Sequence, residues 1–104
     1  MSGRKPKPIR WLNAAVEDAT GIVEWIARDN PQAAERFSEQ LLERVELLRD
    51  FPHLGGVCPY YQKARQLIRG RYIVYYTVHR QEVVIRAIVD GARLFRSYWL
   101  RRED

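Results

Sequence analysis

The segment RQLIRGRYIVYYTVHRQEVVIRAIVD, residues 65–90, decides the fold, because it contains three strand-like runs separated by two short breaks. The middle run, residues 72–78, consists entirely of β-branched and aromatic residues, which favour strands. Residues 65–69 and 82–89 form the runs on either side, across breaks of two and three residues. Because tight connections join antiparallel strands, the segment predicts a three-stranded antiparallel arrangement.

Two amphipathic helices are predicted upstream, over residues 14–28 and 31–50. Asn13 offers a side-chain oxygen to cap the first helix. Asn30 caps the second, and Pro31 takes its first position, where no amide hydrogen is needed. The apolar stripes are formed by Ala15, Ala19, Ile22 and Ile26 in the first helix and by Ala34, Phe37, Leu41, Val45 and Leu48 in the second. One short break between the helices predicts an antiparallel helical hairpin.

These elements predict an α+β fold of order β-α-α-β-β-β, in which the hairpin packs on one face of a small, mainly antiparallel sheet. A short edge strand over residues 9–12 follows two prolines and supplies the first β element. We expect the other sheet face to be concave and open, and the tail over residues 92–102 to be a short helix or extended. The expected core is Ile22, Ile26, Phe37, Leu41 and Val45, in contact with Tyr76 and Ile85. Residues 1–104 are expected to form one domain, with residues 1–8 flexible.

Charge is unevenly distributed along the chain, whose net charge is +5. Residues 11–59 carry nine acidic and four basic side chains, whereas residues 60–104 carry ten basic and four acidic ones. Such a basic half favours phosphates or an acidic protein partner, although a solubilising surface has the same composition. The longest apolar run is far shorter than the ~20 residues of a membrane helix, and no signal-peptide core follows the basic N-terminus. The sequence therefore predicts a cytoplasmic protein with no membrane partner.

Residues that bind metals or carry nucleophilic catalysis are few and isolated. His53 and His79 have no partner at metal-ligand or triad spacing. Cys58, the single cysteine, excludes an internal disulfide and has no His–Asp pattern around it. No phosphate-binding or dinucleotide-binding glycine motif is present in the sequence. We therefore expect no metal and no cofactor.

Cationic and aromatic residues of the C-terminal half are the candidates for binding a target. The set comprises Arg65, Arg69, Arg71, Arg93, Arg96, Tyr98 and Trp99. Arg65 and Arg69 lie four residues apart in a strand and therefore point to the same side. These side chains suit a phosphate backbone or an acidic protein patch. The alternative is that they are ordinary polar side chains on an open sheet face.

Four motifs, taken in order, resemble the RelE/ParE superfamily of toxins. They are ARDNPQAAERF, LLRDFPHLGG, RQLIRGRYIVYYTV and VVIRAIVDGAR, and the resemblance covers roughly residues 9–96. It implies the toxin of a toxin–antitoxin pair, neutralised by a small cognate antitoxin in a hetero-oligomer. RelE-like members cut messenger RNA on the ribosome, whereas ParE-like members share the fold but poison DNA gyrase.

The residues favour the ParE-like branch. The resemblance leads us to expect a phosphate-binding arginine where this chain has Ile73, and lysines or a Glu/His set in the preceding strand, which offers only Arg65 and Arg69. Arginine is never neutral at pH 7 and cannot act as the general base. Arg93 ends the sequence Gly-Ala-Arg that is typical of ParE-like chains, although Asp90 stands where histidine is more usual.

Three functional hypotheses remain open at this point. The first is a toxin that inhibits gyrase by binding, without chemistry of its own. The second is a RelE-like endoribonuclease that acts on the ribosome and messenger RNA, for which Arg93 and a stacking aromatic, Tyr98 or Trp99, are present. The third is a basic nucleic-acid-binding module. Whether the chain is an enzyme therefore stays open.

The antitoxin is expected to lie across the helical hairpin or along a sheet edge, as an amphipathic helix or an added strand. Trp25 is the candidate contact, because it lies off the main apolar stripe of the first helix. An outlying core position is the alternative for this residue.

Overall fold

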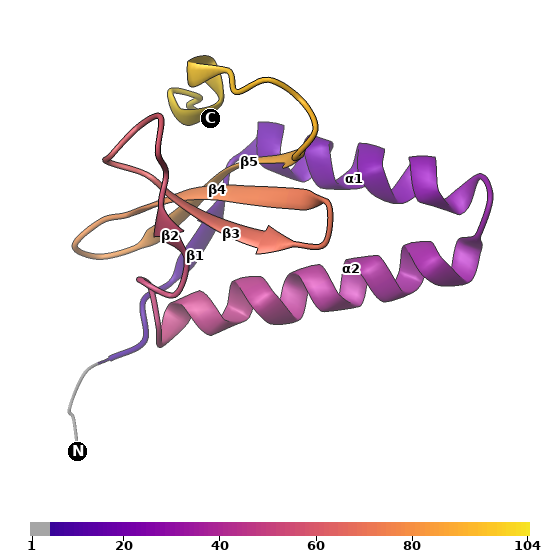
Figure 1. Cartoon of the computed structure of the whole chain (residues 1–104). Coiled ribbons are helices and arrows are strands. Elements are labelled where there is room, and N and C mark those ends of the chain that lie inside the picture. The colour runs from indigo at the N-terminus through magenta and orange to yellow at the C-terminus, as the bar shows by residue number, and fades with distance from the viewer. Residues whose placement is uncertain (1–4) are drawn as a thin grey trace.

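The computed structural model describes residues 5–104 and has the predicted α+β architecture (Figure 1). Two helices pack on a five-stranded sheet. The elements are β1 (Ile9–Trp11), α1 (Asn13–Ala27), α2 (Pro31–Glu46), the 3-10 turn η1 (Leu47–Arg49), β2 (Gly56–Val57), β3 (Arg65–Arg69), β4 (Tyr72–Val78), β5 (Val83–Asp90) and the 3-10 turn η2 (Ser97–Leu100).

The two helices begin in different ways. Asn30 caps α2 as predicted, since its side-chain oxygen accepts a hydrogen bond from the Ala33 amide at 3.0 Å. The predicted Asn13 cap is wrong: Asn13 is the first residue of α1, and the capping position before it, Leu12, makes no side-chain cap. The carboxylate of Asp104 instead accepts from the Asn13 amide, so the C-terminus of the chain satisfies this helix end.

The sheet has the order β1-β5-β4-β3-β2. The β5–β4–β3 part is the antiparallel arrangement that the sequence predicts. Strand β1 pairs with the free edge of β5 and runs parallel to it. The two-residue strand β2, which the sequence analysis missed, pairs with β3. Gly70 turns the chain between β3 and β4 with a φ of +59°, a conformation that costs glycine little. In the β4–β5 pairing Arg86 is an extra residue, because Tyr75 pairs with Ala87 and Tyr76 with Ile85.

The first core lies between the hairpin and the sheet. Leu41, Val45, Tyr76 and Ile85 are buried there as predicted, and Ile22 and Phe37 are partly buried against them. Ile26 is only half-buried near the end of α1 and is not part of this core. The Tyr76 hydroxyl accepts from the Gly55 amide and donates to the Pro52 carbonyl, both at 2.9 Å. These bonds fix the loop that follows α2.

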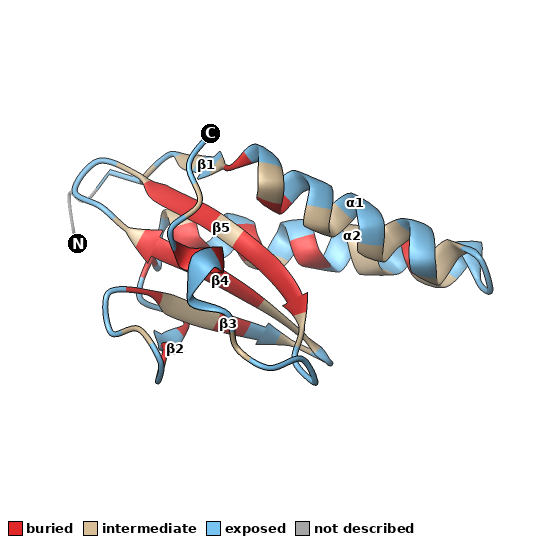
Figure 2. Ribbon diagram, turned by 90° about the horizontal axis from the view of Figure 1, so that it is seen from above, coloured by how far each residue is buried: buried red, intermediate tan, exposed pale blue. Residues whose placement is uncertain are grey.

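The other sheet face is not open, and this expectation of the sequence analysis is wrong. The C-terminal segment crosses β4 and β5 on that face, opposite the helices (Figure 2). A second core forms beneath it and comprises Cys58, Ala64, Tyr75, Ala87, Val89, Trp99 and Leu100. The physical reason is that β4 and β5 carry apolar side chains on both faces, so both faces need cover.

The N-terminal expectation concerns residues 1–8, of which residues 1–4 lie outside the described part of the chain. Lys7 is fastened to the fold. Its amide donates to the Arg49 carbonyl at 2.9 Å, and its ammonium donates to the carbonyls of His79 and Arg80 at 3.0 and 2.6 Å.

Candidate functional site

Arg65 and Arg69 point to the same side of β3, and that side faces the helices. Both share a face with Leu67, which lies in the first core. Arg65 donates hydrogen bonds to the carbonyls of His53 and Gly55, and Arg69 donates to the side chain of Gln40 on α2. These guanidinium groups therefore hold loops and helix α2 to the sheet.

Arg71 lies at the turn after β3 and pairs with Asp90 at the end of β5. The backbone amide of Ala92 and the Arg71 guanidinium hold the pKa of the Asp90 carboxyl below its ordinary value. The amide of Arg93 in turn donates to the Asp90 carbonyl at 3.0 Å. Asp90 thus shapes the turn from which the C-terminal segment leaves the sheet.

The structure separates the aromatic residues of the C-terminal segment. Trp99 is 2% exposed and packs against Tyr75 and Phe95, with ring centroids 6.0 Å away in each case. Tyr98 is 51% exposed and has the guanidinium of Arg102 5.8 Å from its ring. Of the two candidate aromatic contacts, Tyr98 is therefore accessible to a partner, whereas Trp99 is buried in the second core.

The end of the C-terminal segment is fastened to α1 and β5. Arg102 makes an ion pair with Asp18 at 2.7 Å and donates to the Arg86 carbonyl at 3.1 Å. Arg86 returns a hydrogen bond to the Arg102 carbonyl at 2.8 Å. Asp18 also accepts from the Ile88 amide at 3.0 Å, so one carboxylate ties together helix, strand and tail.

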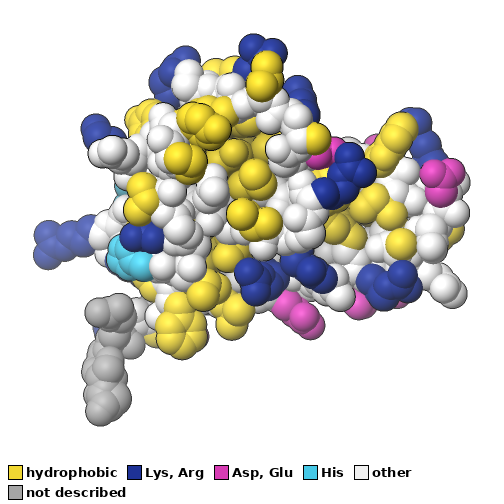
Figure 3. Space-filling model, in the orientation of Figure 1, with side chains coloured by type: hydrophobic (Ala, Val, Ile, Leu, Met, Phe, Trp, Pro, Cys, Tyr) yellow, Lys and Arg dark blue, Asp and Glu magenta, His cyan; other side chains and the backbone are white. Residues whose placement is uncertain are grey.

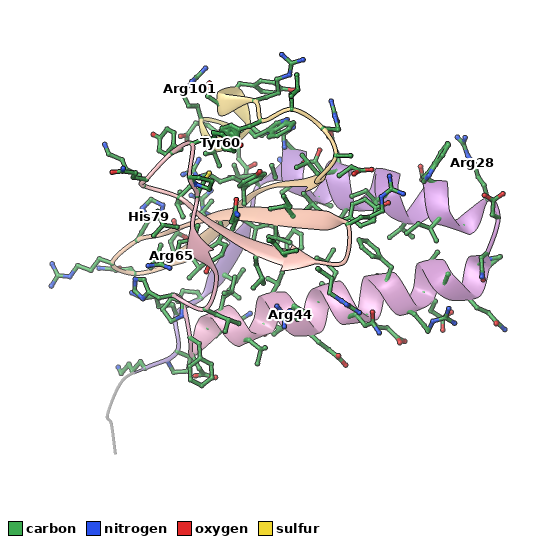
Figure 4. The ribbon with its side chains drawn as sticks, viewed as in Figure 1. Arg28, Arg44, Tyr60, Arg65, His79 and Arg101 are labelled. Carbon is green, nitrogen blue, oxygen red and sulfur yellow. The ribbon has the colours of Figure 1, made fainter. Side chains whose placement is uncertain are left out.

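Exposed cations and aromatic rings gather on the two segments that cover this sheet face. Tyr60, 70% exposed, stacks on Phe95 with ring centroids 4.9 Å apart and planes inclined by 22°. Figure 3 shows apolar and basic side chains intermixed at the top of the molecule, and Figure 4 places Tyr60 and Arg101 at that end. We call this the basic aromatic surface; it comprises Tyr60, Lys63, Arg93, Arg96, Tyr98 and Arg101.

The sequence analysis missed Tyr60, Lys63 and Arg101, although a signal was available. The covering segments, residues 58–64 and 91–102, contain five basic side chains and no acidic one. None of the four cations of the surface makes an ion pair within residues 5–104, in contrast to Arg71 and Arg102. Several such cations beside exposed aromatic rings make this surface a candidate for binding an anionic partner.

A second feature is an apolar groove of about 660 Å³ along the helical hairpin. It is lined by Trp11, Val16, Ala19, Thr20, Val23, Glu24, Ser38, Leu41 and Leu42. Val16 and Leu42 are well exposed within it. Trp25, 62% exposed, lies on another side of α1, in a depression that also involves Tyr72 and Arg93.

Comparison with known proteins decides the family. Residues 9–95 match the model of the ParE toxin of type II toxin–antitoxin systems, parDE. The chain belongs to the ParE toxin family. Its structure is similar to that of a chromosomal ParDE toxin–antitoxin system from P. aeruginosa, with a TM-score of 0.70 and 20% identity over 81% of this chain and 95% of that one. No curated protein gives a match.

In this ParE toxin, the far-face positions of β3 and of the first half of β4 carry side chains unsuited to acid–base chemistry. At the other end of β4, the Thr77 hydroxyl lies 2.8 Å from a ring nitrogen of His79 and accepts a hydrogen bond from Arg86 at 2.9 Å. Ile73, where the superfamily resemblance suggests an arginine, packs half-buried against the second core. Gln66 and Ile68 are the far-face residues of β3, since Leu67 between them faces the helices. Burial raises the pKa of the Tyr75 hydroxyl above its ordinary value.

Neither a metal centre nor a membrane-spanning helix is found within residues 5–104. No group of three or more metal-ligating His, Cys, Asp or Glu side chains comes together there. Neither helix of the hairpin is long and apolar enough to cross a membrane.

Proposed function

We propose that this ParE toxin inhibits DNA gyrase, and with it replication, by binding through the basic aromatic surface. The observation that carries the proposal is the composition of β3 and of the first half of β4 on the far sheet face, where Ile73, Gln66 and Ile68 stand in place of a phosphate-binding cation and a general base. Losing an acid–base group typically costs 10²–10⁴-fold in rate, whereas binding needs only shape and charge. Because gyrase acts in the cytoplasm, we propose the cytoplasm as the site of action.

A supercoiling assay with purified gyrase and the full-length toxin tests the proposal. We expect inhibition that added antitoxin reverses and that Arg93→Gln or Arg96→Gln weakens. Arg36→Gln is the matched control, because Arg36 is an exposed arginine on α2. Truncating the chain before Trp99 would be uninformative, since it removes part of the second core.

Messenger RNA cleavage is the competing activity, and the exposed Arg93 and Tyr98 are the residues that favour it. Primer extension on transcripts after induction of the toxin should show intact messages. The same cells should form filaments and induce a DNA damage response. Codon-positioned cleavage with gyrase unaffected would replace the proposal with the RelE-like endoribonuclease alternative.

For the cognate antitoxin, we propose an amphipathic helix seated in the groove between α1 and α2. The groove is apolar, and Val16 and Leu42 leave apolar surface exposed that such a helix would cover. Leu42→Lys should abolish co-purification of the antitoxin. Leu47→Lys is the matched control, because Leu47 is similarly exposed but does not line the groove. If Trp25→Ala abolishes co-purification and Leu42→Lys does not, the antitoxin binds on the other side of α1.

A further inference from the structure

Tyr60 presents an aromatic platform of a kind that binds flat rings. Phe95 covers one face of its ring in a stacked geometry, and with 70% of the residue exposed the opposite face is open to solvent. Phe95 itself contacts Tyr75 and Trp99 at centroid distances of 5.8 and 6.0 Å. The platform is therefore held by the second core, so an incoming ring needs little reorganisation of the protein.

The covering segments that hold this platform also carry four cations, none of which makes an ion pair within residues 5–104. Lys63 lies on the same loop as Tyr60, and Arg96 directly follows Phe95 in the chain. The Arg101 guanidinium donates to the Ser97 hydroxyl at 3.0 Å, and the Arg93 guanidinium lies 5.7 Å from the centroid of the Trp99 ring. These four cations lie in residues 58–64 and 91–102, where no acid occurs in the sequence, and they complement a polyanion.

From this arrangement we propose that the basic aromatic surface binds single-stranded nucleic acid directly, with unpaired bases stacked on Tyr60 and Tyr98 and phosphates on the four cations. Open ring faces beside cations match both parts of a single strand, whereas an acidic peptide would use the cations alone. A duplex keeps its bases stacked internally and would likewise leave the rings unused. The inference does not depend on gyrase being the target.

The test is fluorescence anisotropy of labelled 12-nucleotide DNA and RNA strands with the full-length toxin, freed of antitoxin. We expect tighter binding to a strand than to a duplex of the same phosphate number. With four phosphate contacts, the logarithm of the binding constant should fall with log salt at a slope of about −3. A preference between the DNA and RNA arms identifies which strand the toxin meets.

Two kinds of variant separate stacking from charge. Tyr60→Leu should weaken strand binding about 5-fold or more with the salt slope unchanged, and Tyr60→Phe, which keeps the ring, should bind like the parent. Arg96→Gln should reduce the salt slope by about 0.7. Arg28→Gln removes one exposed arginine at the far end of α1 and should leave binding unchanged.

Three results would overturn the inference. The first is equal affinity for strand and duplex with no effect of Tyr60→Leu, because such a result would mean that net charge alone attracts the nucleic acid. The second is equal weakening by Arg28→Gln and Arg96→Gln. The third is binding to vesicles containing anionic lipid or to an acidic peptide, with no binding to either oligonucleotide. Gyrase inhibition by a toxin that binds no strand would refute this inference and leave the proposed function intact.

Discussion

Replacing Trp99 with alanine should destabilise the toxin by about 4 kcal/mol. Trp99 is 2% exposed, and its indole packs against the rings of Tyr75 and Phe95. Large-to-small substitutions of buried tryptophan cost about 3–5 kcal/mol, and each aromatic pair adds about 0.5–1.5 kcal/mol beyond its buried area. These contacts place the substitution in the upper half of that range.

Urea unfolding followed by circular dichroism measures this loss. For a chain of this size, a slope of about 1.5 kcal/mol per molar urea converts a loss of about 4 kcal/mol into a midpoint about 2.7 M lower. Trp25→Ala is the matched control, because that tryptophan is 62% exposed and its loss should change stability by less than about 0.5 kcal/mol. Trp99→Phe, which keeps one ring, should fall between the two.

Equal midpoints for Trp99→Ala and Trp25→Ala would refute the reasoning. Such a result would mean that the C-terminal segment does not pack on the sheet in solution. The second core would then lack its cover, and the placement of Tyr98, Arg93 and Arg96 on one surface would fall with it.

Three further predictions concern other parts of the fold. Leu41→Ala should cost about 2–5 kcal/mol in the same assay, because Leu41 is buried in the first core, and a neutral result would contradict the helix packing. Asn30→Ala should cost about 1 kcal/mol through loss of the α2 cap, whereas Asn13→Ala should be nearly neutral. Hydrogen bonding to Arg10 lowers the pKa of Glu82, so the stability that this pair contributes is present above pH 4.5 and is lost as the pH falls through the lowered value. Glu82→Gln should therefore reduce the loss of stability on acidification, measured by urea unfolding at a series of pH values. An unchanged pH dependence of stability would exclude a role for the pair.

Local signals predicted the parts of the fold that depend on neighbouring residues. Asn30 and Pro31 mark the start of α2 because cap and first helical turn are adjacent in sequence. The strands β3 and β4 end where the sequence predicts, since Gly70 permits the turn between them. Such features need no knowledge of tertiary contacts.

Features that depend on distant contacts were not predictable in this way. The cap of α1 is supplied by Asp104, which lies 91 residues away along the chain. The spacing of Phe95, Tyr98 and Trp99 is the same for an exposed amphipathic turn and for one buried against a sheet. Arg65 and Arg69 were correctly placed on one side of a strand, but only Leu67, packed in the first core, shows that this side faces the helices.

Ion pairs hold the two ends of the C-terminal segment, whereas the arginines between those ends make none within residues 5–104. Arg71 and Arg102 are matched by Asp90 and Asp18, and they fix the two ends of the C-terminal segment. Because both ends are fixed, the segment between them can hold Arg93 and Arg96 outward over the second core without unfolding. A variant that breaks the Arg102–Asp18 pair, such as Asp18→Asn, would therefore loosen the basic aromatic surface without altering any residue in it, and would show whether its rigidity matters for binding.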